Sequence, residues 1–129
     1  MDDNFRATQI LRQNKIAIWG SFILLPDFSK EDFRKLIRYH KQLKPELLTF
    51  SPLVPHPLTP LYEEYKDRLI YDQEDYEKWN FGDVLIRPSK MTLKQYYWEI
   101  LKFGIPINLN FYSVKYMLTA FPLSNTFRM

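Results

Sequence analysis

The residue types that most often carry chemistry are scarce in this chain of 129 residues. It contains no cysteine and only two histidines, His40 and His56. Cysteine nucleophiles, disulfides, thiolate zinc sites and cysteine-ligated iron–sulfur clusters are therefore excluded. Two histidines could hold a metal ion only with several carboxylates beside them. We expect His40 to lie in solvent on a polar helix face. His56, between Pro55 and Pro57, should be a surface residue or reach a substrate.

An acidic run and three isolated glycines are the other candidates for chemistry. The acidic residues are Asp72, Glu74, Asp75 and Glu77. Their carboxylates are ligands that calcium accepts, but the segment lacks the glycine and the spacing of an EF-hand loop, so we expect a solvated face. Gly20, Gly82 and Gly104 are far apart, whereas phosphate-binding loops group their glycines. The sequence therefore excludes a P-loop and a dinucleotide-binding fingerprint.

The composition predicts one folded domain spanning residues 1–129. Hydrophobic residues make up 46% and charged residues 26% of the chain, which is typical of a globular protein. The 18 basic and 15 acidic residues are interleaved, so we expect no nucleic-acid partner. No apolar run approaches the roughly 20 residues that a membrane span needs. The acidic N-terminus is unlike a secretory signal, so we expect a cytoplasmic protein.

Hydrophobic periodicity predicts an α/β fold in the first half of the chain. We expect helices over 5–13 and 30–43, and buried strands over 16–25 and 47–51. Ser29 is a suitable N-cap for the second helix, since an acidic residue follows three positions later. This order predicts two parallel strands joined by a right-handed crossover helix.

The second half of the chain should be mostly helical. Four prolines in residues 52–60 forbid regular structure there, and a short helix over 61–68 should follow. Residues 84–86 could form a third strand or an extended segment. A capping box at Thr92 starts a helix that Gly104 should end as its C′ residue, and a last helix over 110–120 should stop at Pro122, before a loose tail.

Several apolar positions in these helices should face inward, and one aromatic triplet cannot. The expected inward positions include Phe5, Ile10, Leu11, Leu93, Tyr96, Tyr97, Ile100, Leu101, Val114, Met117, Leu118 and Phe121. Three consecutive residues cannot share one helix face, so at least one of Tyr96, Tyr97 and Trp98 should point outward. That side chain would contact a partner or lie on the surface.

Three segments, in the same order, resemble the end of radical S-adenosylmethionine (SAM) enzymes of the cobalamin-binding subgroup. Gly20–Phe33 contains Pro-Asp-Phe-x-x-Glu-Asp-Phe and resembles the fifth barrel strand with the loop and helix after it. Leu48–Tyr62 is similar to the sixth strand and the proline-rich stretch that follows it. Phe81–Tyr97 is similar to the segment that leads from the barrel into a C-terminal helix. By this resemblance residues 16–66 would be the end of a partial radical SAM-type barrel, and 67–129 a mostly helical extension.

The resemblance implies a parent enzyme that cleaves SAM reductively with a 4Fe-4S cluster, giving a 5′-deoxyadenosyl radical. Cobalamin is a further cofactor of the subgroup, whose members carry out methyl transfer or ring-forming chemistry. The family holds its cluster on a C-x-x-x-C-x-x-C loop, which a chain without cysteine lacks. We therefore expect no cofactor in this chain alone, no catalysis from it alone, and a partner in the remainder of its own enzyme.

By the same resemblance, residues at the ends of the two strands would contact SAM, largely through backbone groups. These residues are Phe22, Pro26, Asp27, Ser51, Pro52 and Leu53. Purely structural roles are the alternative, because Phe22 suits a hydrophobic core and Asp27 could cap the next helix. The chain departs from the family where Leu25, Asp27 and Leu58 replace glycines, which would let backbone approach a ligand closely.

Two functions from different classes follow from this sequence. The first is a C-terminal portion of a radical SAM enzyme that supplies part of the SAM and substrate side of the barrel. Its exposed sheet edge would invite pairing with another chain, so self-association is expected. The second is a non-enzymatic α+β module that binds a protein partner through an aromatic surface, since aromatic residues make up 17% of the chain.

Overall fold

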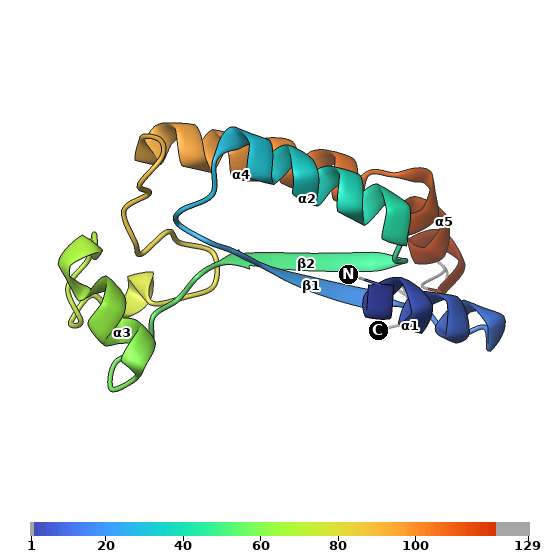
Figure 1. Cartoon of the computed structure of the whole chain (residues 1–129), viewed down its shortest axis with the longest axis horizontal. Helices are drawn as coiled ribbons and strands as arrows, with labels where there is room; N and C mark the ends of the chain where they lie inside the picture. Colours follow the sequence, from blue (N-terminus) through green and yellow to red (C-terminus); the bar gives the residue numbers. More distant parts are fainter. Residues whose placement is uncertain (1, 121–129) are drawn as a thin grey trace, which may run out of the picture.

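A sheet of two parallel strands organises the computed structural model, which describes residues 2–120 (Figure 1). The elements are α1 (Asp2–Gln13), β1 (Trp19–Leu24), α2 (Lys30–Leu43), β2 (Leu47–Pro52), α3 (Pro60–Tyr65), η1 (Lys66–Arg68), η2 (Tyr76–Lys78), α4 (Leu93–Asn108) and α5 (Phe111–Ala120). The predicted α/β class and the parallel strand pair are confirmed. None of the helices in this described part is long and apolar enough to span a bilayer.

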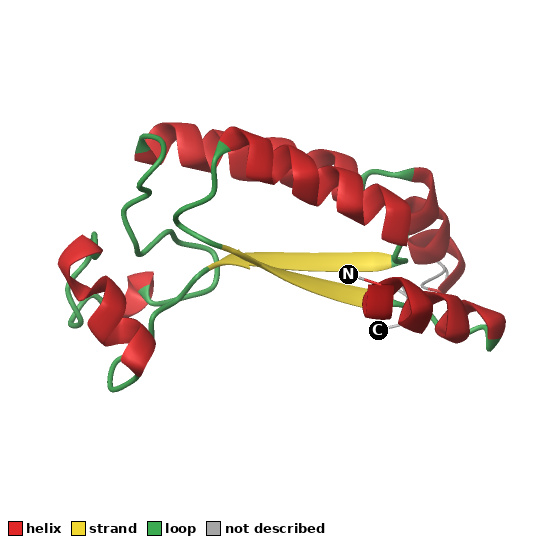
Figure 2. Ribbon diagram, viewed as in Figure 1, coloured by secondary structure: helices red, strands yellow, loops and turns green. Residues whose placement is uncertain are grey.

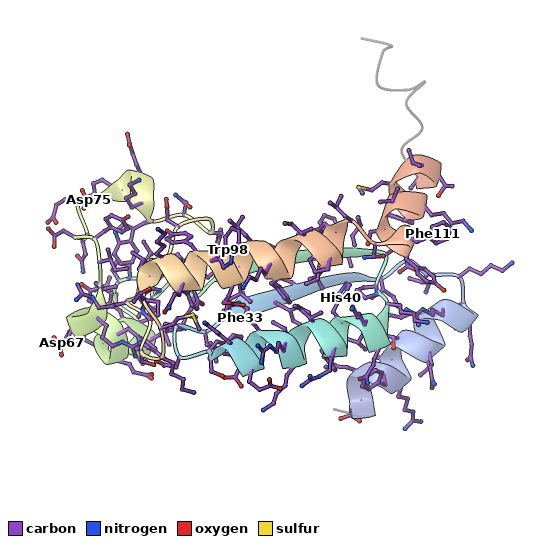
Figure 3. The ribbon with its side chains drawn as sticks, turned by 90° about the horizontal axis from the view of Figure 1, so that it is seen from above. Phe33, His40, Asp67, Asp75, Trp98 and Phe111 are labelled. Carbon is purple, nitrogen blue, oxygen red and sulfur yellow. The ribbon has the colours of Figure 1, made fainter. Side chains whose placement is uncertain are left out.

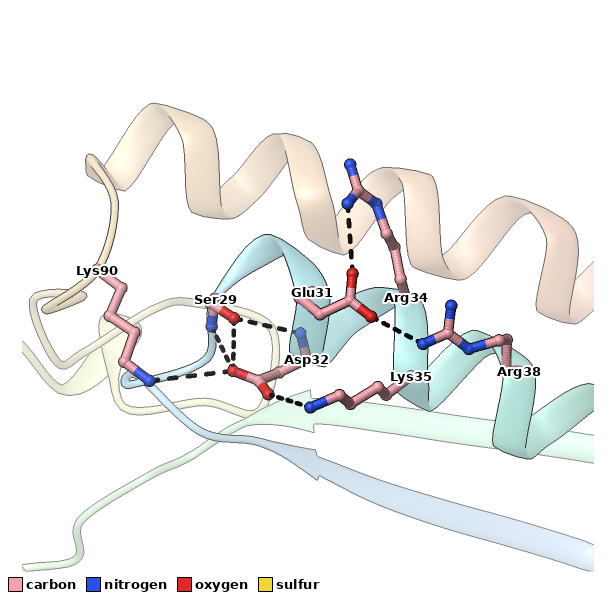
Figure 4. A network of polar contacts seen from close by, with 7 residues as sticks. All are labelled: Ser29, Glu31, Asp32, Arg34, Lys35, Arg38 and Lys90. Atoms are coloured by element: carbon pink, nitrogen blue, oxygen red, sulfur yellow. Dashed lines mark hydrogen bonds and ion pairs between the residues drawn. The ribbon is translucent and has the colours of Figure 1, made fainter.

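Helix α2 crosses from the end of β1 back to the start of β2, and its termini are set by local chemistry. The Ser29 hydroxyl accepts from the Asp32 amide, and the Asp32 carboxylate accepts from the Ser29 amide, which completes the predicted capping box. Figure 4 shows that Asp32 also faces Lys90, 4.0 Å away. The helix ends at Leu43 and is capped by Lys44, a left-handed residue with φ 48° whose amide donates to the His40 carbonyl.

The strands run in register from Trp19 opposite Leu47 to Leu24 opposite Pro52. Side chains alternate across the sheet, so Phe22 and Leu24 of β1 share a face with Leu48 and Phe50 of β2. Helices α2 and α4 lie side by side over this face, while α3 and the 3-10 turns lie beyond the carboxyl ends of the strands (Figures 1 and 2).

The core between the sheet and the two helices is largely aromatic. Phe103 of α4 is fully buried, and its ring contacts those of Phe22, Phe33 and Phe50 with centroids 5.2 to 6.3 Å apart. Tyr96, two turns earlier on α4, packs edge-on against Phe33, with ring centroids 5.6 Å apart. Much of the high aromatic content is therefore used to hold α2 and α4 on the sheet.

The predicted end of α4 at Gly104 is wrong. The helix continues to Asn108, and Gly104 lies inside it, where an added Cβ would stand 2.9 Å from the ring of Phe50. The glycine therefore allows α4 to approach β2 closely instead of ending the helix. Residues 84–86 form no strand, but Ile86 makes an isolated antiparallel bridge with Leu69 and the segment is buried.

Four of the positions expected to face inward are largely exposed. Ile10, Leu101, Met117 and Leu118 expose 40 to 59% of their surface, because α1, α4 and α5 are covered on fewer sides than the pattern implied. The expectations for Phe121, Pro122 and the tail lie outside the described residues. The aromatic triplet behaves as predicted, because Tyr96 is buried and Trp98 is 58% exposed.

Candidate functional site

The carboxyl end of the sheet is the place where open parallel sheets bind ligands, and four of the six candidate residues lie at this end or in the loops that leave it. Pro26 and Asp27 follow β1, Pro52 ends β2, and Leu53 comes next. The Leu53 amide donates to the Leu24 carbonyl at 3.0 Å, so the two strand ends are tied together. Pro26 and Pro52 are buried there.

Asp27 is the centre of a polar cluster at this end. Its carboxylate accepts from Arg68 Nη2 at 2.8 Å, from the Ser89 hydroxyl at 2.5 Å and from the Tyr65 hydroxyl at 3.4 Å. The hydrogen bonds from Arg68 and then Ser89 lower the pKa of Asp27 below its usual 3.8. Asp27 therefore fastens the β1 loop to η1 and to the 87–89 segment, and it does not cap α2.

Replacing Asp27 with asparagine should loosen this fastening. Because its side chain is 42% exposed, we expect a loss of only roughly 0.5–1 kcal/mol in the free energy of unfolding near pH 7. The lowered pKa stabilises the fold above pH 3.8, and this contribution is lost as the pH falls through the folded-state pKa. Urea unfolding at several pH values should show the gap between wild type and Asp27→Asn closing in acid.

The matched control is Asp67→Asn in the neighbouring turn. Asp67 is exposed and makes no ion pair among residues 2–120, so this variant should match wild type. Equal losses for the two variants would show that Asp27 contributes only general surface charge.

The carbonyl groups at the end of β1 are already engaged within the chain. Tyr96 donates its hydroxyl to the carbonyls of Leu24 and Leu25, at 3.1 and 3.0 Å. The Pro26 carbonyl accepts from the Ser89 amide at 3.3 Å. Burial strongly raises the pKa of Tyr96, so its hydroxyl keeps the proton that it donates. These three carbonyl groups therefore help to hold α4 and the 87–89 segment against the end of β1.

The side of the sheet opposite α2 and α4 is uncovered by the described helices. Trp19 and Ile23 of β1 point to it and expose 71 and 58% of their surface. Ser51, paired with Ile23 in the register, shares this open face, and its hydroxyl makes no hydrogen bond with the described residues. Phe22 lies on the other face, in the aromatic core. Of the six candidates, Ser51 is thus the one with a free polar side chain on the open face.

Leu58, which stands where the resembled family has a glycine, has a backbone conformation that disfavours leucine. Its φ is 67°, in the left-handed region that disfavours residues with a Cβ, and its side chain is fully exposed. The next residue, Thr59, caps α3 by accepting from the Tyr62 amide at 3.2 Å. The backbone therefore keeps a shape suited to glycine although leucine occupies the position.

Replacing Leu58 with glycine should stabilise the protein. Relief of left-handed strain outweighs the extra entropy of the unfolded glycine, so we expect a gain of about 0.5–1 kcal/mol in urea unfolding. Leu58→Ala keeps the Cβ and should bring no such gain. A lower stability for the glycine variant would mean that the exposed side chain has favourable contacts or that the strain is negligible.

The remaining candidates for chemistry, the acidic run and the two histidines, differ in how exposed they are. The acidic run is exposed as predicted, and no group of three or more metal-ligating side chains gathers within the described part of the chain. His56 is exposed, with its ring 6.4 Å from that of Phe81. The prediction that His40 is solvated is wrong, since it is 4% exposed between α2 and α4 (Figure 3).

Three partners of Asp27 in this cluster were not foreseen from the sequence. Tyr65, Arg68 and Ser89 lie 38, 41 and 62 residues from Asp27, and no local spacing connects them. Arg68 also donates to the Arg87 carbonyl and lies over the Tyr65 ring. The only signal in the sequence was that Asp27 stands where the resembled family has a glycine, which indicates a role for the Asp27 side chain.

Comparison with known proteins gives partial matches to three enzymes. The chain is 31% identical over 91 residues to the anaerobic magnesium-protoporphyrin IX monomethyl ester cyclase of Cereibacter sphaeroides. It is 35% identical over 82 residues to bacteriochlorophyllide d C-12(1)-methyltransferase of Chlorobaculum tepidum, and 26% identical over 92 residues to the C-8(2)-methyltransferase of the same organism. No family model and no solved structure matches the chain.

These matches cover much of this chain and little of the relatives. They include 63 to 70% of the present sequence but only 14 to 20% of each relative. The chain is therefore similar to one segment of larger enzymes, two of them methyltransferases and one a cyclase.

Proposed function

We propose that this chain is the C-terminal part of a radical SAM enzyme of the cobalamin-binding type, acting in the cytoplasm, and that it supplies the last two strands of the barrel. The observation that carries the proposal is the one-sided sheet. Helices cover the face of Phe22 and Leu48, and the face of Ile23 and Ser51 is open. In a barrel of parallel strands the helices lie outside and the inner face lines the site.

The relatives support this proposal at the level of reaction class. Their names describe a cyclisation and two methyl transfers, which are the reactions that the resemblance implies for the subgroup. We propose a tetrapyrrole as the parent's substrate class, because all three names specify one.

The residues of this chain fit part of a SAM site and do not fit the cluster. Ser51 offers a hydroxyl on the open face, and Pro52 and Leu53 continue the backbone beside it. SAM would supply the activated methyl or adenosyl group, and these residues would position it. A chain without cysteine has no thiolate for iron, so the cluster belongs to the remainder of the enzyme.

Complementation tests the proposal directly. The cyclase of Cereibacter sphaeroides would be produced with its 91 matched residues deleted and then mixed with the present chain. We expect a one-to-one complex by light scattering and, with a reductant, formation of 5′-deoxyadenosine from SAM. The relative's own deleted segment is the positive control. If that segment restores the complex and this chain neither binds nor restores activity, the proposal is wrong.

A second candidate function rests on the exposed face of α4. Trp98, Leu101 and Ile105 each expose 55 to 60% of their surface at helical spacing, and Trp98 projects from the side of α4 away from α2 (Figure 3). Such a stripe is typical of a helix that binds a protein partner. Binding that Leu101→Glu abolishes and that Ile23→Arg leaves intact would favour this alternative.

A further inference from the structure

The α4–α5 corner, formed by Leu109, Phe111, Tyr112 and Leu118, is an exposed apolar surface. These four side chains expose 71, 78, 52 and 59% of their surface. Phe111 and Leu118 are seven residues apart, so they share one face of α5. Figure 3 shows α5 turning away from α2 at the end of α4, with Phe111 at the start of α5. Exposed apolar surface of this kind is typical of a site that binds a protein or a membrane.

The charges around the α4–α5 corner are of one sign. Residues 100–129 contain no aspartate or glutamate, so all 15 acidic residues precede them in the chain. Lys115 lies one turn after Phe111 on the same face of α5, and Lys44 Nζ stands 5.8 Å from the centre of the Tyr112 ring. Both lysines are exposed, and neither forms an ion pair within the described part of the chain.

The acidic side chains that are nearest in sequence to this corner have other partners. Glu99 is only 9% exposed and accepts from Lys102 Nζ at 3.1 Å. The Glu46 carboxylate accepts from the Ile18 amide at 2.7 Å. The lysines of the corner therefore keep their positive charge available beside the apolar side chains. This combination complements a membrane surface, which offers anionic headgroups above an apolar layer.

The shape of the α4–α5 corner favours a bilayer over a folded partner. Its apolar side chains project from the turn between two helices and do not line a groove. The cavity beside Tyr112 has a volume of about 190 Å³, which is too small to receive a helix or a strand. Aromatic and leucine side chains on a projecting turn can enter the boundary between headgroups and acyl chains, while lysines reach the phosphates on flexible stems. The 10 residues of α5 are too few to span the bilayer, so the contact is peripheral.

We infer that the α4–α5 corner docks this protein onto an anionic lipid bilayer, with Phe111 and Leu118 at the headgroup boundary and Lys44 and Lys115 against the phosphates. Anionic lipids are typical of cytoplasmic leaflets, so peripheral docking is compatible with a protein of the cytoplasm. The inference uses neither the open sheet face nor any residue proposed to contact SAM, so it stands or falls independently of the barrel proposal.

Co-sedimentation of the protein with lipid vesicles tests the inference. Vesicles of phosphatidylcholine and phosphatidylglycerol in equal parts are compared with vesicles of phosphatidylcholine alone, and a sample without vesicles corrects for aggregation. We expect binding to the anionic vesicles, at least about tenfold weaker binding to the neutral ones, and weaker binding when the salt is raised from about 0.1 to 0.5 M. Equal binding to both kinds of vesicle would overturn the inference. No binding to the anionic vesicles would also overturn it, and a protein partner would then be the better occupant of the corner.

Two exposed phenylalanines provide a matched pair of variants. Phe111 is 78% exposed in the corner, and Phe81 is 67% exposed just after the acidic run in the sequence. Phe111→Ala should weaken binding to the anionic vesicles roughly tenfold, because the ring leaves water when the corner docks. Phe81→Ala should leave the binding unchanged. If Phe111→Ala binds as well as wild type, another surface carries the lipid contact and the inference is wrong.

Two exposed lysines test the contribution of charge in the same way. Lys115→Gln and Lys78→Gln each remove one positive charge, but Lys78 lies beside the acidic run, with its Nζ 5.7 Å from the centre of the Tyr71 ring. Affinity for the anionic vesicles should fall about fivefold for Lys115→Gln and stay unchanged for Lys78→Gln. Equal weakening in both variants would mean that only the net charge of the protein attracts it to the lipid, and would contradict docking through the corner.

Discussion

Replacing Phe103 with alanine is expected to cost about 3–5 kcal/mol in the free energy of unfolding. Phe103 is fully buried, and it contacts an aromatic ring from β1, one from α2 and one from β2. Truncation would leave a cavity where α4, α2 and the sheet meet through this side chain. Domains of this size are stable by only about 5–15 kcal/mol, so the variant should be partly or wholly unfolded.

Chemical unfolding followed by circular dichroism measures this loss, and two variants make it interpretable. Phe111→Ala removes the same ring from a position that is 78% exposed on α5, and it should change stability by less than about 0.5 kcal/mol. Phe103→Leu keeps most of the volume and should lose less than the alanine variant. A loss below about 1 kcal/mol for Phe103→Ala would mean that α4 is not held through this ring.

Ile23→Arg should abolish association with the rest of the enzyme, on the proposal that the open face lines the barrel. Ile23 is 58% exposed in this chain, so the arginine is solvated and the fold should keep its stability. Closing the barrel over it would bury an unpaired charge, which costs several kcal/mol. We expect the affinity for the complementary part of the cyclase to fall at least about 100-fold, measured by calorimetry.

Ile10→Arg is the matched control for this prediction. Ile10 is 50% exposed on α1 and does not belong to the sheet, so its replacement should leave the affinity unchanged. Unaltered binding of Ile23→Arg would show that the open face does not take part in the contact. The exposed stripe of Trp98, Leu101 and Ile105 on α4 would then be the better candidate for an interface.

Local signals in the sequence predicted the elements that are determined by neighbouring residues. Ser29 with Asp32, and Thr92 with Gln95, start the helices where the capping pattern placed them. The apolar run before Pro26 became a strand, and the crossover to β2 followed from the order of elements. The prediction that this strand is buried is wrong for one of its faces, where Trp19 and Ile23 are exposed.

What the sequence did not predict depends on contacts across the fold. Gly104 looks like a helix terminator until Phe50 is placed beside it. His40 looks polar and solvated until α4 covers it. Asp27 could be a ligand contact by resemblance, and its partner Arg68 is distant in the sequence. In the candidate site, sequence position located the strand ends correctly. The face that each side chain occupies became known only from the register of β1 against β2.

The placement of α4 also sets the order in which the chain can fold during synthesis. The contact between Ile18 and Glu46 spans 28 residues, whereas the bond from Tyr96 to Leu24 spans 72. The β1–α2–β2 unit can therefore form while the ribosome is still translating, with its aromatic face uncovered. Until α4 emerges and Phe103 docks, that face is a target for chaperones and for aggregation. Slow translation of residues after Pro52 should therefore lower the yield of folded protein.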